Sequence, residues 1–222
     1  MFQDRTDAGR QLLARMPALD PAETVVVALP RGGVPIGEII AEGLGAPLDI
    51  VFVRKVGFPG HRELALAAVT NGAEPGLVVN EDIARSAGLN RDRIWELAQP
   101  ELREIARRRD SYLGGRAALP VRGKTVIVVD DGIATGATMR ASLQHLRSRG
   151  PSRLILAVPV APEDTLAELE ESAGIDEVIC LKTPEPFYAV GAYYRKFDQV
   201  SDDAVTTALA PASTGSGPAS GP

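Results

Sequence analysis

The feature that most constrains this chain is an apolar run near its middle that ends in two adjacent aspartates. Residues 124–130 read Lys-Thr-Val-Ile-Val-Val-Asp, and Asp131 follows directly. A strand with one solvated face alternates polar and apolar side chains. This run does not alternate, which is typical of a strand covered on both faces. We therefore expect a central strand of a parallel sheet, with two carboxylates at its carboxyl end, where ligands collect in such folds.

Strands and helices alternate along most of the chain. Hydrophobic periodicity and segment length predict strands at 24–29, 48–53, 154–158 and 177–181, and helices at 6–16, 36–44, 138–149 and 163–173. This alternation favours an α/β fold, with an open parallel sheet flanked by helices on both sides.

The stretch between the second strand and the central strand departs from this alternation. Residues 54–62 are rich in glycine and charge, which predicts a mobile loop. Residues 65–70 and 76–80 flank the turn residues Asn71-Gly72, which predicts a hairpin. A helix is expected from about 91 to 113, broken or kinked near Pro100 because proline has no amide donor.

We expect one domain over residues 1–210, followed by a short tail. A small cap or hood is predicted from about residues 80–120, a stretch longer than the core fold needs, and from residues 183–200. Residues 211–222 are almost entirely Pro, Ala, Ser, Thr and Gly. Such a segment cannot bury apolar surface, which predicts disorder.

The composition argues against several classes of protein. Lysine and arginine number 24 and aspartate and glutamate 29, a formal charge of −5, which disfavours a general nucleic-acid binder. The single cysteine, Cys180, excludes a disulfide framework within the chain, and two histidines supply few ligands for structural zinc. The charged N-terminus does not resemble a signal peptide, and no apolar run reaches the roughly 18 residues of a membrane span. The cytoplasm is the expected compartment.

The residues after the acidic pair predict a phosphate-binding loop. Apart from Ile133, residues 132–138 are small or hydroxylated and lead into a helix, whose first amides and dipole favour an anion. Thr135 and Thr138 add hydroxyl donors. A sugar phosphate fits this pattern, with its phosphate in the loop and its vicinal hydroxyls on the carboxylates. Two carboxylates repel a phosphate, so a divalent cation on the ligand is implied. The alternative is an acidic turn followed by a helix cap.

Residues 128–138, Val-Val-Asp-Asp-Gly-Ile-Ala-Thr-Gly-Ala-Thr, resemble the signature of type I phosphoribosyltransferases for 5-phosphoribosyl-1-pyrophosphate (PRPP). The resemblance extends over about residues 24–195 and is strongest to a bacterial group of predicted phosphoribosyltransferases. It implies that Asp130 and Asp131 hold the ribose hydroxyls. It also implies Mg²⁺ as the cofactor, held through ligand and water, with this pair as the candidates for any direct contact. The residues implied to hold the 5-phosphate are Ala134, Thr135, Gly136, Ala137 and Thr138.

Two further segments resemble the family's pyrophosphate-binding elements. Residues 29–33 resemble its pyrophosphate loop, which implies contacts from Arg31, Gly32 and Gly33 and a cis peptide between Pro30 and Arg31; the alternative is a plain turn. Arg54 and Lys55 open a segment to about residue 64 that folds over the active site in the family, and either could neutralise pyrophosphate. The resemblance makes Arg31, Lys55 and Asp131 the candidate catalytic residues. His61 and Arg62 fit a solvated loop better.

A fourth segment bears on the acceptor. Residues 187–191, Phe-Tyr-Ala-Val-Gly, resemble the stretch that lines the base pocket of the purine enzymes, which makes Phe187 and Val190 the candidate base-binding residues. Ordinary core packing of Phe187 is the alternative. The Asp-Tyr pair that often follows is absent, and Gly132 stands where many members have a larger apolar residue. Ala134 replaces an aspartate common in enzymes acting on hypoxanthine and guanine, which weakens that assignment.

The resemblance implies an enzyme of nucleotide metabolism, of the purine-salvage kind, that transfers 5-phosphoribosyl from PRPP to a nitrogen acceptor, most simply a nucleobase, and releases pyrophosphate. A homodimer is the family habit. The rival hypothesis is a regulatory protein that senses PRPP or a nucleotide without chemistry; Arg31 and the Arg54-Lys55 pair favour the enzyme. A P-loop hydrolase is disfavoured because residues 132–138 lack Gly-Lys-Ser/Thr. The basic run 103–110 is predicted to be a solvated helix face.

Overall fold

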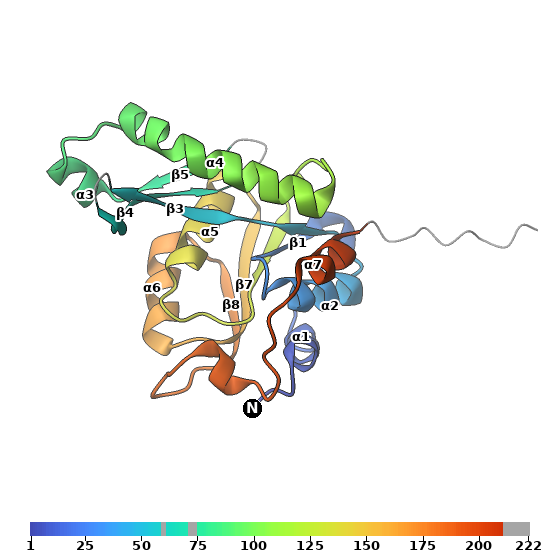
Figure 1. Cartoon of the computed structure of the whole chain (residues 1–222). Coiled ribbons are helices and arrows are strands. Elements are labelled where there is room, and N and C mark those ends of the chain that lie inside the picture. The colour runs from blue at the N-terminus through green and yellow to red at the C-terminus, as the bar shows by residue number, and fades with distance from the viewer. Residues whose placement is uncertain (59–60, 71–74, 211–222) are drawn as a thin grey trace, which may run out of the picture.

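The computed structural model describes residues 1–58, 61–70 and 75–210, with the side chains of 61–65 left out. The described chain forms two sheets (Figure 1). The larger has five strands in the order β2-β1-β6-β7-β8, and the smaller has three in the order β3-β4-β5. The tail predicted to be disordered, 211–222, lies outside the described residues.

The five-stranded sheet is parallel throughout, as predicted. The apolar run after Lys124 forms its central strand, β6, which pairs in register with β1, so that Ala28 lies opposite Val129. The expected α/β fold is therefore confirmed, and the acidic pair follows the middle strand. The strands are β1 (Thr24–Ala28), β2 (Leu48–Ile50), β6 (Thr125–Val129), β7 (Arg153–Val160) and β8 (Glu177–Lys182).

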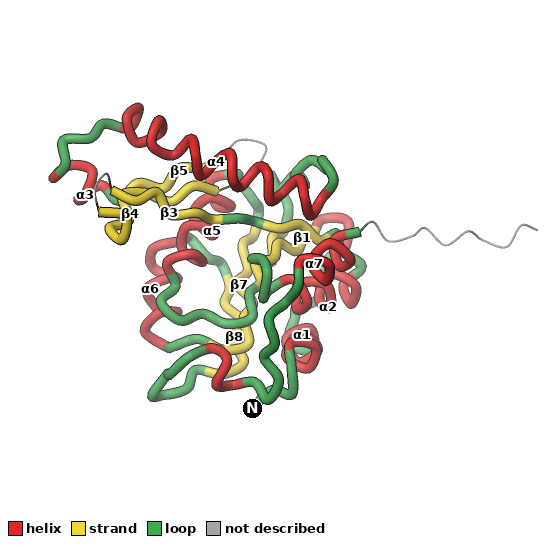
Figure 2. The backbone as a smooth tube through the Cα atoms, viewed as in Figure 1, coloured by secondary structure: helices red, strands yellow, loops and turns green. Residues whose placement is uncertain are grey.

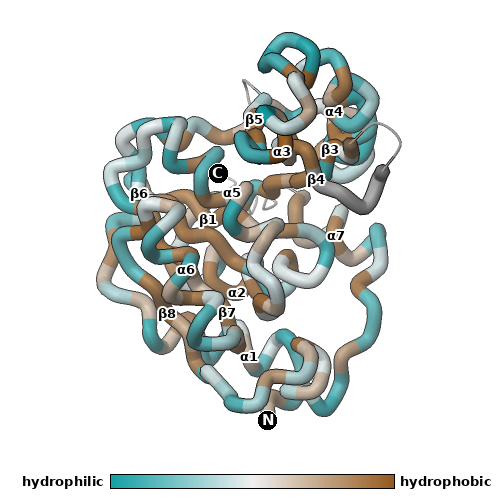
Figure 3. Tube along the Cα trace, turned by 90° about the vertical axis from the view of Figure 1, so that its left-hand side faces the viewer, coloured by the Kyte–Doolittle hydropathy of each residue, from teal (hydrophilic) through white to brown (hydrophobic). Residues whose placement is uncertain are grey.

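Helices cover both faces of this sheet, which explains why its strands do not alternate. Val26 and Ile127 face α1 (Arg5–Leu13) and α2 (Val34–Leu44) in one buried cluster. Val128 faces the opposite way, into a second cluster with α5 (Ala137–Ser148) and α6 (Glu163–Ala173). In Figure 3 the strands form a brown apolar centre within more hydrophilic helices.

The three-stranded sheet corrects one prediction. Residues 54–62 were expected to form a mobile loop, but most of them belong to β3 (Val53–Phe58) and the start of β4 (His61–Thr70). Val56 and Leu66 are buried, so apolar contacts outweigh the local glycine and charge. The predicted hairpin is confirmed: β4 pairs antiparallel with β5 (Gly76–Val79).

A long helix covers the smaller sheet. A break or kink was predicted near Pro100; the break is absent, because α4 (Arg91–Leu113) runs through that residue as one helix. Its apolar side chains Ile94, Ala98 and Ile105 are buried against β3 and β4, which offsets the lost amide donor. The sheet lies between α4 and α5 (Figure 2). Two short helices were not predicted: α3 (Glu81–Ser86) and α7 (Asp202–Leu209).

The N-terminus pairs with residues 193–196 beside α1. Phe2 forms a parallel bridge with Tyr194. The Phe2 amide donates to the Tyr193 carbonyl at 2.8 Å, and the Arg195 amide donates to the Phe2 carbonyl at 2.8 Å. This pairing places the start of α1 next to the segment that follows the short helical turn Val190–Tyr193. Within the described ranges, no helix is both long and apolar enough to span a bilayer.

Candidate functional site

The acidic pair lies at the carboxyl end of β6, as predicted. The Asp131 amide donates to Asp130 Oδ1 at 2.8 Å, and the Asp131 side chain is 14% exposed. Loss of hydration raises the pKa of Asp130 well above its ordinary value, and the neighbouring Asp131 carboxylate raises it further. Burial also raises the pKa of Asp131, although the Arg5 guanidinium opposes that shift. The two carboxylates therefore lie in a poorly solvated position that favours a hydrogen-bonding ligand.

Arg5, which the sequence analysis did not predict as a site residue, lies on α1 and forms an ion pair with Asp131. Its Nε and Nη2 atoms lie 2.9 and 2.7 Å from Asp131 Oδ2, and its guanidinium lies 4.0 Å from the centre of the Phe197 ring. Tyr194 completes this arrangement, because its hydroxyl donates to the Asp131 carbonyl at 2.6 Å. These contacts join residues far apart in the chain, so no local pattern could have indicated them.

The predicted pyrophosphate loop touches the acidic pair. The peptide between Pro30 and Arg31 is cis, as expected. A Cβ atom on Gly32 would lie 2.0 Å from Asp131 Oδ2, and one on Gly33 would lie 2.6 Å from the Val129 carbonyl oxygen. Only glycine lets the backbone come this close to β6. The loop and the carboxylates can therefore contact one small ligand together.

The predicted phosphate loop is open to solvent at the start of α5. Gly136 is the N-cap with φ 70°, a conformation that favours glycine, and no side chain caps the first turn of the helix. Ala134, Thr135, Ala137 and Thr138 are exposed. The amides of this turn therefore have the arrangement that binds anions at helix N-termini.

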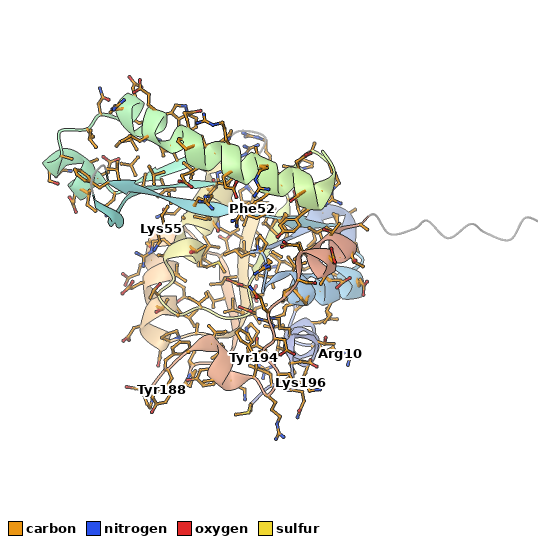
Figure 4. The ribbon with its side chains drawn as sticks, in the orientation of Figure 1. Arg10, Phe52, Lys55, Tyr188, Tyr194 and Lys196 are labelled. Carbon is orange, nitrogen blue, oxygen red and sulfur yellow. The ribbon has the colours of Figure 1, made fainter. Side chains whose placement is uncertain are left out.

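Arg54 and Lys55 lie on opposite faces of β3. Arg54 lines a cavity of about 410 Å³ with Arg31 and Thr138, on the side facing α4. Lys55 lines another of about 330 Å³ with Ala137 and Thr138, on the side facing α5 (Figure 4). Both residues were predicted as candidates for the pyrophosphate; the structure brings Arg54 to the pyrophosphate loop and Lys55 to the start of α5.

Asp202, a second site residue that the sequence analysis did not predict, forms an ion pair with Arg31. Asp202, at the start of α7, lies 3.4 Å from Arg31 Nη1 and accepts a hydrogen bond from the Tyr112 hydroxyl. That hydrogen bond, and then the charge of Arg31, lower the pKa of Asp202. Each of the two proposed ligand-binding groups, Asp131 and Arg31, therefore has a counter-charge from a helix at one end of the described chain.

The predicted base-binding residues lie at and just before the short helical turn Val190–Tyr193. Val190 packs over Gly132, where a Cβ atom would lie 2.5 Å from Val190 Cγ1. Val190 thus fills the space that a larger residue at position 132 would take. Phe187 is partly buried, with its ring centre 5.4 Å from that of Tyr193, while Tyr188 is 80% exposed and points outward (Figure 4). The side chains of His61 and Arg62 lie outside the described part.

The carboxylates present suit a cation that arrives on its ligand. Within the part of the chain that the structure describes, no group of three or more His, Cys, Asp and Glu side chains could hold a metal by itself. Asp130 and Asp131 are only two, and Mg²⁺ needs no more than one or two carboxylates when substrate phosphates supply the other oxygens.

Comparison with known proteins places this geometry in context. Residues 8–193 match the family model described as a phosphoribosyl transferase domain. Two proteins of Mycobacterium tuberculosis, named "Putative phosphoribosyl transferase Rv0571c" and "Putative phosphoribosyl transferase MT0597", are each 44% identical over 209 residues. That match covers 94% of this chain and 46% of each relative, so the chain spans about half the length of these curated proteins. The crystal structure of TT1426 from Thermus thermophilus superposes with a TM-score of 0.80 at 39% identity, covering 94% of this chain and 97% of that one.

Proposed function

Because the chain belongs to the phosphoribosyl transferase domain family, we propose that it transfers the 5-phosphoribosyl group from PRPP to a nitrogen acceptor and releases pyrophosphate. One observation carries the proposal. The loop at Gly32 approaches Asp131 so closely that a Cβ atom would lie 2.0 Å from Asp131 Oδ2. A ligand with hydroxyls between two phosphate groups can contact both elements and the open turn before α5 at once.

Each part of PRPP has a matching element in this arrangement. The 5-phosphate accepts from the amides of the turn 134–138 and from the hydroxyls of Thr135 and Thr138. The ribose hydroxyls donate to Asp130 and Asp131. The pyrophosphate lies against Arg31 and the Gly32 amide, with Arg54 lining the same cavity. Gly33, also predicted to contact it, contributes close approach rather than a donor, because its amide donates to the Leu29 carbonyl at 3.0 Å. Lys55 lies nearer the 5-phosphate, because its side chain faces α5.

The chemistry follows from where charge develops. As the bond between the anomeric carbon and pyrophosphate stretches, the sugar ring gains positive charge and the leaving group negative charge. Arg31 and the loop amides stabilise the leaving group, and the carboxylate pair lies beside the cationic ring. Holding the ribose at both ends also orients it for the acceptor. Mg²⁺, carried on the ligand phosphates with Asp130 and Asp131 as the nearest protein candidates, supplies further charge neutralisation when bound.

We further propose that the acceptor is a nucleobase, as in purine salvage, which binds beside Val190 and Phe187. Support comes from Val190, whose side chain packs over Gly132, next to the acidic pair. The layer of β3, β4, β5 and α4 and the segment 183–200 would then wall the site from two sides (Figure 1). A homodimer and a cytoplasmic location also stay predictions.

The experiment compares wild type with Asp130→Asn/Asp131→Asn. Calorimetry with Mg²⁺ and PRPP should give saturable binding for wild type and none for the double variant. Pyrophosphate release during incubation with purines, pyrimidines and simple amines identifies the acceptor. Undiminished PRPP affinity in the double variant would defeat the proposal. If PRPP binds but no acceptor in the panel causes pyrophosphate release, the rival function, a PRPP sensor, would be favoured.

A further inference from the structure

Two arginines of α4 line the same cavity as the proposed pyrophosphate loop. The cavity of about 410 Å³ lies between that loop, the start of β3, the start of α5, α4 and α7. The sequence predicted a solvated helix face at 103–110. Arg107 and Arg108 are indeed 68% and 48% exposed, yet both also line the cavity. We call its four cationic residues the arginine wall: Arg31, Arg54, Arg107 and Arg108.

The arginine wall keeps hydrogen-bonding capacity for an anion. Glu104 accepts from Arg107 Nε at 2.9 Å and from Arg108 Nε at 2.8 Å, which holds the two guanidinium groups side by side. These hydrogen bonds lower the pKa of Glu104 to about 2. Each guanidinium has five N–H donors, whereas Glu104 accepts three hydrogen bonds from the two groups. Donors therefore remain for a second anion.

The charges that face the cavity also favour an anion. Arg31 pairs with Asp202, Arg54 with Glu101, and Arg107 and Arg108 share Glu104. Four guanidinium groups thus meet three carboxylates, which leaves one positive charge in excess. A bound phosphate group can replace one of these carboxylates as the ion-pair partner of a guanidinium group. Binding therefore exchanges one ion pair for another and buries no additional unpaired charge.

The position of these two arginines is fixed by the next residues on α4. Arg109 forms an ion pair with Asp49 at 3.0 Å, where the two side chains are 13% and 7% exposed, and donates to the Ile50 carbonyl. The Tyr112 ring stacks on Phe52, with ring centres 5.9 Å apart. This end of α4 is therefore anchored at the junction of β2 and β3, close to the proposed pyrophosphate loop.

We propose that Arg107 and Arg108 bind the pyrophosphate end of PRPP, as an extension of the subsite that begins at Arg31. This inference rests on the proposed function. It adds a ligand contact from α4, where residues 103–110 were predicted to form a solvated helix face. The chemical class bound is a diphosphate, either attached to the sugar or released as the leaving group. Thr138, assigned to the 5-phosphate, also lines this cavity, so the test must separate binding of the diphosphate from binding of the 5-phosphate.

The test measures the affinities of three ligands for wild type and for a double alanine variant. Arg107→Ala/Arg108→Ala should bind inorganic pyrophosphate and PRPP about tenfold or more weakly in the presence of Mg²⁺, because two charge-assisted contacts are lost. Ribose 5-phosphate lacks the pyrophosphate, so its affinity should change less than about twofold. Arg103→Ala is the matched control, since Arg103 lies on the same helix but does not line the cavity. Arg107→Lys/Arg108→Lys keeps both charges and should recover most of the pyrophosphate affinity.

Glu104→Gln gives a change in the opposite direction. It removes a negative charge from the arginine wall and releases guanidinium donors, so pyrophosphate should bind about threefold more tightly. If Glu104 served only to position the Arg107 and Arg108 side chains, its substitution would make pyrophosphate bind more weakly instead.

The outcomes separate this inference from the proposed function. If wild type binds PRPP and the double alanine variant keeps its pyrophosphate affinity, or loses ribose 5-phosphate affinity equally, the role of α4 is wrong and the proposed function stands. If wild type binds neither PRPP nor ribose 5-phosphate, the proposed function fails and this inference falls with it. Circular dichroism of each variant checks that it is folded.

Discussion

Arg5 Nη2 lies 2.7 Å from Asp131 Oδ2, so a residue at the first position of α1 holds a carboxylate at the end of the central strand. Arg5→Gln should weaken PRPP binding about tenfold. Without the guanidinium, Asp131 ionises less readily, and a protonated carboxyl accepts hydrogen bonds poorly. The free energy of unfolding should fall by about 1–3 kcal/mol, because Asp131 is left largely buried without its charged partner. Calorimetry and urea unfolding measure the two effects.

Arg10→Gln is the matched control for Arg5, because Arg10 lies on the same helix and points to solvent (Figure 4). It should leave both quantities unchanged. If both substitutions changed PRPP affinity and the free energy of unfolding equally, Arg5 would act through the net charge of α1 and not through its contact with Asp131.

Gly32→Ala should raise KM for PRPP by at least about tenfold. The added methyl group would lie 2.0 Å from Asp131 Oδ2. Asp131 cannot move away freely, because Arg5 holds it, so the loop must shift and lose its alignment. Steady-state kinetics measure the change. Gly43→Ala is the control: the three atoms nearest to its Cβ all belong to the Leu13 side chain, away from the site. It should leave KM unchanged.

Asp130→Asn should make the protein more stable at neutral pH while it loses PRPP binding. The pKa of Asp130 is raised in the folded state, mainly by burial. The folded protein therefore holds more protons than the unfolded chain between the two pKa values, and stability falls as pH rises through that window. We expect a gain of about 1–2 kcal/mol at pH 7, in the range usual for relieving a functional site.

The pH dependence checks this explanation. The advantage of Asp130→Asn should shrink as the pH falls towards about 4, the pKa of an unfolded aspartate, because the wild-type carboxyl is then also neutral. Urea unfolding at several pH values measures the difference. A difference that does not vary with pH would mean that packing, not charge, causes it.

Val190→Ala should raise KM for the acceptor and leave KM for PRPP unchanged. Val190 packs over Gly132 beside the acidic pair, on the side proposed for the base. Removing two methyl groups should weaken acceptor binding by about 1–2 kcal/mol, or roughly five- to thirtyfold. Tyr188→Ala is the control, since Tyr188 is 80% exposed. If only the KM for PRPP changed, Val190 would contact PRPP and not the acceptor, which would contradict the proposal.

Asp49→Ala should destabilise the protein by about 3–5 kcal/mol, because it leaves a buried Arg109 without its partner. Asp49 also accepts hydrogen bonds from the Ile50 and Leu119 amides, so the substitution removes more than one contact. Arg103→Ala, on the exposed face of α4, should change stability by no more than about 0.5 kcal/mol. Urea unfolding decides; a loss under about 1 kcal/mol for Asp49→Ala would contradict the anchoring of α4.

The features that the sequence predicted best are those that neighbouring residues determine. The parallel sheet, Asp130 and Asp131 at the carboxyl end of its central strand, and the turn before α5 follow from short patterns, and the structure has them. The cis peptide at Arg31 came from the resemblance and is also present. Residues 54–58 and 61–62 were wrongly predicted to lie in a mobile loop, because burial of Val56 and Leu66 outweighs local composition.

The remaining site residues depend on contacts between distant segments. Arg5 reaches Asp131 only because Phe2 pairs with Tyr194. Asp202 reaches Arg31 only because α7 packs on α2 and α4. No spacing rule connects such residues, since the folded chain alone brings them together.

The position of Arg54 and Lys55 on β3 has a consequence for related chains. Successive side chains of a strand point to opposite faces, so inserting or deleting one residue between β2 and Arg54 would exchange the two cations. The lysine would then face α4, and the arginine would face α5. In relatives that keep this site, the junction should tolerate many changes of residue type but few changes of length.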